Sequence, residues 1–191
     1  MCDDAPMDDA AARERLLDAA EDLFYARGIQ SVGMDAVRDA SGLPLKRVYA
    51  LYPGKAALVE AVLVRRDVRW RGRLMARALE EDAPRDRVLA VFDWLEGWFG
   101  EPGFRGCAWI NASGELGATL PVVAEQARLH KAAFRADLLG LVRGAGLPDE
   151  TADGVLLLAE GAMVTAGIFG TAAPAREARA AAARLIDAGG S

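Results

Sequence analysis

The feature that most constrains this chain is the stretch Val32–Lys55, in which two short helical patterns flank a turn that contains glycine. The first pattern, Met34–Ala40, repeats apolar residues at positions i, i+3 and i+6, as one face of a helix does. Ser41–Leu43 interrupts the pattern, and Pro44 stands where a second helix begins. Proline is well tolerated at a first helical position because its missing N–H would have no helical partner there. The spacing therefore predicts two short helices, 34–40 and 44–52, joined by a tight turn.

Two short helices joined by a glycine-containing turn of three or four residues form a helix-turn-helix, whose second helix can enter the major groove of DNA. We expect the second helix to bury Val48 together with residue 51 or 52. Its opposite side then carries three side chains that can reach DNA, those of Lys46, Arg47 and Tyr49. Arg47 can hold the O6 and N7 atoms of guanine through two hydrogen bonds, a contact worth about 1–3 kcal/mol in discrimination between bases.

The distribution of charge favours the same interpretation, although the whole chain carries a net charge of −5. Residues 27–73 contain ten Lys or Arg and four acidic residues, a local charge of +6, which leaves −11 for the remainder. A basic region on an otherwise acidic, soluble body is typical of a DNA-binding end. A solvated basic helix face is the alternative, and the neighbouring helix-turn-helix favours the DNA-binding interpretation.

Composition excludes several other classes of protein. No uninterrupted apolar run approaches the ~20 residues that a membrane helix needs, and the acidic amino terminus, MCDDAPMDD, lacks the apolar core of a secretory signal. Cys2 and Cys107 are too few for a disulfide framework, so we expect a cytoplasmic protein. One histidine and two distant cysteines give no metal-ligand spacing, and we expect neither a metal nor another cofactor.

Helical spacing continues along the chain, without β-patterned runs, and predicts an all-α fold of about nine helices. Residues 1–8 are expected to form a disordered tail. The fourth helix, about 27 residues long, would span about 40 Å and connect a DNA-binding end to a distant body. Its expected inner residues are Leu58, Val62, Val68, Leu74 and Ala78. The expected longer helices cover residues 8 or 9 to 26, 55–81, 84–99, 120–145, 149–170 and 173–188.

The run from Arg13 to Leu58 resembles the DNA-binding segment of the TetR family of one-component transcriptional regulators. The residues that carry this resemblance are Leu17, Asp18, Ala19, Ala20, Leu23, Phe24, Gly28, Val37, Ser41, Gly42, Leu43, Val48, Tyr49, Tyr52, Lys55 and Leu58. The resemblance implies a helix-turn-helix domain at 1–54 with three helices. It also implies a helical domain at 55–191 that binds an effector and forms a dimer.

Four positions depart from the family pattern. Gly33 replaces the Ser or Thr that usually caps the second helix, a change that costs a few tenths of a kcal/mol. Pro44, Lys46 and Tyr52 replace the more usual Ser, Gly and Phe. These departures bear on which operator is read rather than on the fold.

The resemblance also assigns phosphate contacts. Tyr49 matches the family tyrosine whose hydroxyl meets a backbone phosphate, with packing as the alternative, whereas Tyr52 is expected to serve mainly in packing. Lys55 matches the family lysine at the start of the fourth helix, where the helix dipole also favours an anion. Phosphate contacts position a protein on DNA without reading sequence. The full set of expected DNA-binding residues is Gly33, Met34, Pro44, Leu45, Lys46, Arg47, Tyr49 and Lys55.

A second resemblance concerns residues 106–115, where the run GC-x-x-x-NA-x-x-E is similar to a subset of TetR proteins near the sixth helix, which floors the effector cavity. Effector pockets are mostly apolar with a few placed polar groups. The residues that can line one here are Phe92, Trp94, Trp98, Trp109, Asn111, Glu115, His130, Phe134 and Met163. Ordinary core packing is the alternative for each of them, and an inert buried thiol is the alternative to a redox role for Cys107.

The segment 155–169 is apolar nearly all round, which is unusual for a surface helix of a monomer. Small residues along it and along the last helix would let another helix approach closely. We expect a homodimer interface built as a four-helix bundle, with a central core helix as the alternative. The expected interface residues are Gly161, Ala162, Ala166, Gly167 and Ala183. A two-fold dimer would place its recognition helices about 34–36 Å apart on a pseudo-palindromic site.

The sequence therefore predicts a homodimeric repressor that leaves double-stranded DNA when a small, largely apolar effector occupies the body. Two other functions are alternatives. A small enzyme could use Cys107 or His130 with Glu115, but no set of nucleophile, base and orienting group is recognisable. A helical adaptor that binds only protein would explain neither the helix-turn-helix nor the basic region. We expect no catalytic activity and no membrane association.

Overall fold

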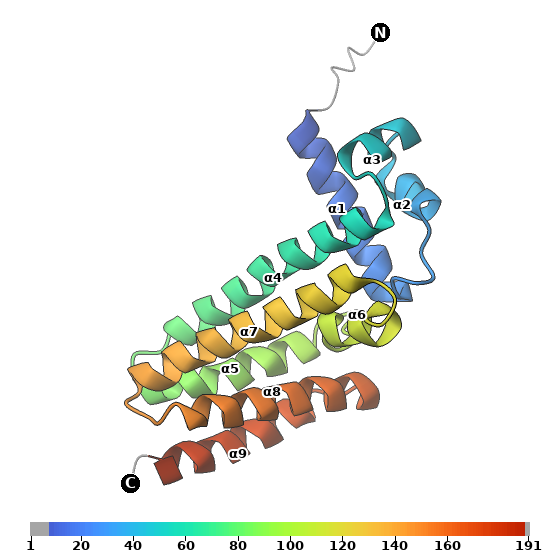
Figure 1. The fold of residues 1–191 in the computed structure, drawn as a ribbon. Helices are drawn as coiled ribbons and strands as arrows, with labels where there is room; N and C mark the ends of the chain where they lie inside the picture. Colours follow the sequence, from blue (N-terminus) through green and yellow to red (C-terminus); the bar gives the residue numbers. More distant parts are fainter. Residues whose placement is uncertain (1–7, 190–191) are drawn as a thin grey trace. The chain divides into compact units, whose positions relative to one another are not determined.

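The computed structural model describes residues 8–189, and in that range the chain forms nine α-helices and no strand (Figure 1). The predicted all-α fold is confirmed, whereas the predicted disordered tail lies, apart from Asp8, outside the described residues. The helices are α1 (Asp9–Arg27), α2 (Met34–Ser41), α3 (Leu45–Leu51), α4 (Lys55–Leu79), α5 (Pro84–Phe99), α6 (Ala108–Leu116), α7 (Pro121–Gly144), α8 (Glu150–Phe169) and α9 (Ala173–Gly189).

Several helix boundaries differ from the sequence prediction by one or two residues, and those of α3 and α4 are examples. Pro44 precedes α3 as its N-cap instead of being its first residue, because its ψ of 141° is extended. Its carbonyl oxygen nevertheless accepts the N–H groups of Arg47 and Val48, at 2.8 and 3.1 Å, and so closes the first turn of α3. The long helix α4 begins at Lys55 as expected but ends at Leu79 rather than at residue 81.

The inward face of α4 also differs from the prediction in its second half. Val68 was expected inside, but it is 65% exposed, whereas Trp70 is 5% exposed. Trp70 follows Leu63 by seven residues and precedes Leu74 by four, which keeps it on the buried stripe of the helix. Val68 lies two residues from Trp70, about 200° around the helix, and therefore points to solvent.

The chain divides into two compact units that cut across the order of the sequence. Unit 1 holds the described residues up to Arg66 together with Trp109–Ala127, and unit 2 holds Asp67–Ala108 together with residues 128–189. Helices α4 and α7 thus contribute residues to both units. The boundary predicted between a DNA-binding domain 1–54 and an effector domain 55–191 concerns function and stays a prediction.

Unit 1 is built on the helices α1, α2 and α3, which pack against one another (Figure 1). On α1 the buried residues Leu16, Ala20 and Phe24 recur every four residues. Val37 of α2 and Val48 of α3 are fully buried. Burying side chains of this size contributes about 1.5–3 kcal/mol each. Two helices of eight and seven residues, which would be marginal alone, are therefore held by a shared core.

In unit 2, α8 and α9 pack against each other and both contact α5 (Figure 1). Small residues make the approach close, since a Cβ atom at Gly154 of α8 would collide with Leu185 of α9. Ala159 and Ala182 are fully buried. By length and composition alone, α8 is apolar enough to cross a membrane, but the core helix of a soluble protein passes the same test.

Candidate nucleic-acid interface

The turn between α2 and α3 is fixed by three hydrogen bonds. Gly42 ends α2 in the left-handed conformation, with φ of 65°, and its N–H donates to the carbonyl of Arg38 at 2.9 Å. The buried Ser41 hydroxyl donates to the same carbonyl at 3.0 Å and accepts the N–H of Leu43 at 3.4 Å. Glycine takes this conformation without a steric penalty. The Ser-Gly-Leu run therefore sets the direction in which α3 leaves the turn.

Helix α3 has one buried side and one exposed side. Val48 and Leu51 face the core of unit 1, with 0% and 7% exposed. On the other side Leu45 is 39% exposed and Tyr49 45% exposed, and Pro44 and Lys46 are also exposed. The predicted amphipathic arrangement is therefore present, and four of the expected DNA-binding residues share an accessible surface.

The carboxyl end of α3 is held by a residue that the sequence analysis did not single out. Arg13 of α1 donates to the carbonyl oxygen of Leu51 at 3.3 Å, and its guanidinium lies 5.6 Å from the centre of the Tyr52 ring. A cation at this end of a helix also interacts favourably with the helix dipole. Tyr52 is half-buried, as its expected packing role requires.

The other expected contacts lie at the edges of this surface. Arg47 is half-buried and forms an ion pair with Asp9 at the start of α1. Gly33 is the exposed N-cap of α2, followed by the half-buried Met34. Lys55 is half-buried at the start of α4, where its Nζ donates to the carbonyl of Gln30 at 3.3 Å. Burial lowers the pKa of Lys55, although the charge of Glu115 opposes this effect.

The local charge of +6 overstates the basic surface that is available to DNA. Arg65 is only 13% exposed and pairs, at 2.8–3.0 Å, with three carboxylates of α1, those of Glu14, Asp18 and Glu21. Arg66 pairs with Glu21 at 2.8 Å and lies 4.2 Å from the centre of the Tyr25 ring. These arginines fasten α4 to α1 within unit 1. Their acidic partners lie outside the stretch 27–73, so the local count of +6 did not include the negative charges that neutralise them.

A family model described as bacterial regulatory proteins of the tetR family matches residues 16–62, which include α2, the turn, α3 and the first turns of α4. The chain carries the TetR-family domain. A TetR transcriptional regulator from Streptomyces avermitilis, sav143, is 29% identical with a TM-score of 0.81, covering 93% of this chain and 97% of that one. SCO4454, a TetR-family regulator from Streptomyces coelicolor, is 26% identical with a TM-score of 0.84, covering 94% and 90%.

E. coli NemR in its reduced form shares the fold at 22% identity, with a TM-score of 0.81 over 91% of this chain and 96% of that one. Among proteins with curated descriptions, none matches this sequence. The solved structures cover nearly the whole chain, so the TetR fold extends through both units and beyond the 16–62 segment.

In unit 2, several expected effector-pocket residues surround Trp70 of α4. Trp70 makes edge contacts with four rings, whose centres lie 5.1–5.5 Å away, those of Trp94, Trp98, His130 and Phe134. Trp94 stacks on Trp98 at 5.6 Å. Trp70 is not among the residues expected from the sequence, although its spacing from Leu63 and Leu74 was a usable signal. Phe92 and Met163 are also fully buried in unit 2.

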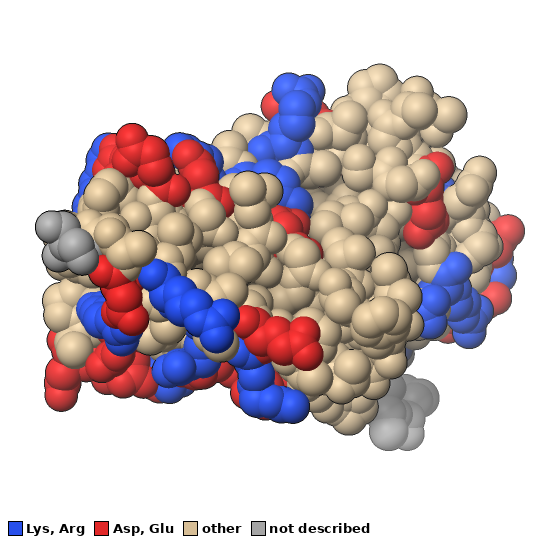
Figure 2. Space-filling model, turned by 90° about the horizontal axis from the view of Figure 1, so that it is seen from below, with Lys and Arg blue, Asp and Glu red and all other residues tan. Residues whose placement is uncertain are grey.

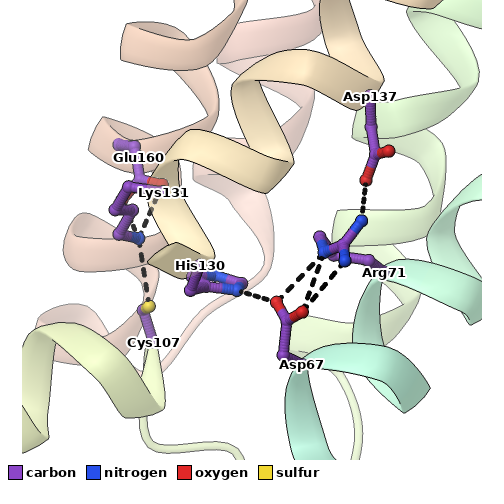
Figure 3. Close-up of polar contacts among 7 residues, drawn as sticks. All are labelled: Asp67, Arg71, Cys107, His130, Lys131, Asp137 and Glu160. Atoms are coloured by element: carbon purple, nitrogen blue, oxygen red, sulfur yellow. Dashed lines mark hydrogen bonds and ion pairs between the residues drawn. The ribbon is translucent and has the colours of Figure 1, made fainter. Parts of the chain in front are cut away.

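Figure 3 shows a chain of polar contacts that ends at His130, the ring that contacts Trp70. The Nδ1 atom of His130 lies 2.6 Å from Asp67 Oδ1, and Arg71 binds Asp67 at 2.9–3.2 Å and Asp137 at 2.7 Å. Burial lowers the pKa of His130 to about 4, despite the opposing hydrogen bond to Asp67. Burial also acts to raise the pKa of Asp67, but hydrogen bonds from Arg71 and His130 outweigh it and the pKa falls below its ordinary value. At neutral pH His130 is therefore uncharged and donates its Nδ1 proton to an ionised carboxylate.

A second polar cluster in unit 2 contains Cys107, which is 3% exposed (Figure 3). The ammonium of Lys131 lies 3.3 Å from its sulfur and binds both carboxylate oxygens of Glu160, at 2.6 and 2.7 Å.

The remaining expected pocket residues belong to unit 1, where Trp109 is buried and Asn111 exposed. There the carboxylate of Glu115 accepts the N–H of Gln30 at 2.9 Å, so Cys107 and Glu115 each have partners within their own units.

The expected interface residues of α8 and α9 fall into two groups. Ala162 and Ala166 are at most 5% exposed and lie in the core of unit 2, and Ala183 is half-buried. Gly161 and Gly167 are at the surface. Gly167 also packs within the unit, because a Cβ there would lie 3.2 Å from the Cα of Gly106.

Large apolar residues, which the sequence analysis did not propose, dominate the exposed side of α8. Leu157 is 72% exposed, Val164 41%, Ile168 74% and Phe169 73%. With Gly161, the first three recur at i, i+4, i+7 and i+11, the spacing of a helix that packs lengthwise against another. Figure 2, which views the side where α8 and α9 lie, shows a broad uncharged area bordered by acidic and basic residues.

Proposed function

We propose that this chain is a homodimeric transcriptional repressor that binds a pseudo-palindromic DNA operator through α3 and leaves it when a small, largely apolar effector binds. The observation that carries the proposal is the exposed face of α3 on a TetR-family domain. Lys46 and Arg47 are proposed to contact base edges or phosphates. Tyr49 and Lys55 are proposed to contact phosphates. Gly33, Met34, Pro44 and Leu45 complete the contact surface.

A second copy of the chain is the proposed partner of α8. An exposed stripe of Leu157, Gly161, Val164 and Ile168 is costly in water but complementary to itself in a two-fold arrangement. Side chains as exposed as Leu157 and Ile168 would gain about 1.5–3 kcal/mol each on full burial. A two-fold dimer also matches the symmetry of an operator whose half-sites lie one helical turn apart.

The proposed effector binds in unit 2, near the aromatic residues around Trp70. Phe92, Trp94, Trp98, Phe134 and Met163 supply apolar surface, and His130 supplies a polar group held in one orientation by Asp67. Trp109, Asn111 and Glu115 belong to the segment that folds with the DNA-binding helices. Binding is proposed to shift α4, which contributes residues to both units, and so to change the separation of the two α3 helices in the dimer.

The experiment is a gel shift with duplex DNA that flanks the gene, at one fixed salt concentration. Arg47→Ala should weaken operator binding by about 1–3 kcal/mol, because one bidentate base contact is lost. Arg143→Ala is the matched control, since it removes the same charge from an exposed position of α7 in unit 2. Thermal unfolding should be nearly the same for all three proteins. Equal affinities for wild type and Arg47→Ala would contradict the assigned contact, and a wild type that binds no duplex would contradict the function.

The effector is then sought by screening small molecules for release of the bound duplex. We expect apolar and aromatic compounds to release it, and substitution of the half-buried Trp94 by alanine to reduce the response while leaving operator binding intact. Release by strongly charged compounds alone would contradict the proposed character of the body site.

A further inference from the structure

Glu115 of α6 lies against the loop that joins α1 to α2, within unit 1. The backbone N–H of Gln30 donates to its Oε2 at 2.9 Å. Both carboxylate oxygens lie 3.0 Å from the position that a Cβ atom would take at Gly28, whose φ is 86°. Glycine at this position therefore both permits the backbone conformation and leaves room for the carboxylate. The Glu115 carboxylate is thus held both by the hydrogen bond from Gln30 and by close packing against Gly28.

Lys55 binds the same residue of the loop through its backbone carbonyl. Its Nζ donates to the carbonyl oxygen of Gln30 at 3.3 Å, while the charge of Glu115 favours the protonated form of the lysine. Gln30 thus connects a carboxylate of α6 to the first residue of α4. Because Lys55 is the proposed phosphate contact at the amino end of α4, its position bears directly on DNA affinity.

We propose that Glu115 is a positioning residue that sets the place of Lys55 through Gln30. The assignment rests on the proposed function, because it takes Lys55 to contact DNA. Among described residues beyond Arg66, the segment Trp109–Ala127 is the part that folds into unit 1. A displacement of α6 is therefore transmitted to the phosphate contact through two hydrogen bonds, without any change in α3.

The first test measures hydrogen exchange at the Gln30 amide in the free protein. In Glu115→Ala the amide loses its acceptor, so its exchange should become about 3- to 10-fold faster, as loss of a solvent-accessible hydrogen bond predicts. In Glu115→Gln the side-chain carbonyl still accepts, and exchange should stay near the wild-type rate. Glu60→Ala, at an exposed position of α4, controls for the loss of one negative charge. Unchanged exchange in Glu115→Ala would overturn the assignment.

The second test compares the two Glu115 variants in DNA binding, with and without Lys55→Ala. Both variants remove one negative charge, so the difference between them isolates the hydrogen bond. Glu115→Ala should bind about 3- to 10-fold more weakly than Glu115→Gln. Its affinity should also depend less on salt, the logarithmic slope falling by about 0.9 per protomer because one phosphate contact is lost.

In the Lys55→Ala background, the difference between the two Glu115 variants should nearly disappear, because both substitutions act on the same contact. A role of Glu115 in general stability alone would give the same difference in both backgrounds, and that result would overturn the assignment while the proposed function stands. A wild-type chain that binds no duplex would instead overturn the proposed function, and with it the role of Lys55.

Discussion

The two compact units of this chain use their charged residues differently. In unit 1, the largely buried Arg65 and Arg66 pair with carboxylates of α1 and fasten α4 to it, while one side of α3 stays exposed. In unit 2, Asp67 and Arg71 lead into a buried histidine beside a group of aromatic rings. Charged residues of unit 1 thus join α1 to α4, whereas charged residues of unit 2 hold the ring of a buried histidine in place. Substitutions should therefore act mainly on binding in unit 1 and mainly on stability or assembly in unit 2.

The largest effect is expected on α8 of unit 2. Leu157→Asp combined with Ile168→Asp should weaken dimer formation by at least about 5 kcal/mol, because four carboxylates would be desolvated in the proposed two-fold interface. Light scattering after size exclusion should show a monomer at micromolar concentration, and operator binding should be lost with it. Val68→Asp is the control, since Val68 is equally apolar and 65% exposed on α4. A double variant that remains dimeric would place the interface elsewhere.

The next effect is expected at the centre of the aromatic cluster. Trp70→Ala should lower the free energy of unfolding by about 3–5 kcal/mol, because a buried indole leaves a cavity among its four ring neighbours. Trp94→Ala should cost less, since Trp94 is half-buried. Urea unfolding of both variants measures the difference. An equal loss of unfolding free energy in the two variants would contradict the central position of Trp70 in the cluster.

Acid should destabilise unit 2 through His130. Below pH 6.5 the unfolded chain binds a proton at this residue, whereas the folded chain excludes it until the pKa of about 4. Stability is therefore complete above pH 6.5 and falls as the pH is lowered to 4, by about 3 kcal/mol at that limit. His130→Asn, whose amide can still donate to Asp67, should be less stable at pH 7 but should lose less on acidification. Parallel pH profiles from thermal unfolding would show that other groups cause the loss.

The smallest effect is expected on the exposed face of α3. Tyr49→Phe should weaken DNA binding by about 1 kcal/mol, to a similar extent for every duplex, because a phosphate contact carries no sequence information. Its stability should not change, since the side chain is 45% exposed. Tyr52→Phe is the matched control and should bind DNA like the wild type. A loss confined to one DNA sequence would instead make Tyr49 a base-reading residue.

Much of unit 1 was predictable because its elements are specified by neighbouring residues. The Ser-Gly-Leu run sets the turn through Gly42 and the Ser41 hydroxyl, and the spacing of Val48 from Leu51 gives the buried side of α3. The partners of Arg65 and Arg47 were not predictable, because Glu14, Asp18, Glu21 and Asp9 are brought to them only when α1 packs. The charge counted along the sequence consequently exceeded the charge that the folded surface presents.

The candidate body site was predictable in composition but not in arrangement. The aromatic residues were recognisable, yet Trp70 was passed over for Val68, and Glu115 was expected beside the pocket although its carboxylate binds the loop after α1. On α8 the small residues were noticed first, whereas Leu157, Val164 and Ile168 form the exposed stripe. An apolar helix has several faces that look alike in sequence, and only its neighbours decide which one is covered.

The sequence by itself determined the helices, the helix-turn-helix and the TetR-family domain, because period, caps and turns depend on residues a few positions apart. The tertiary structure alone decided that Trp109–Ala127 folds with the DNA-binding helices, that His130 is buried against Asp67, and that Gln30 joins Glu115 to Lys55. These contacts join residues 25 to 85 positions apart. A hydrogen bond or a buried charge at such separation exists only after the whole chain has packed, and no local pattern encodes it.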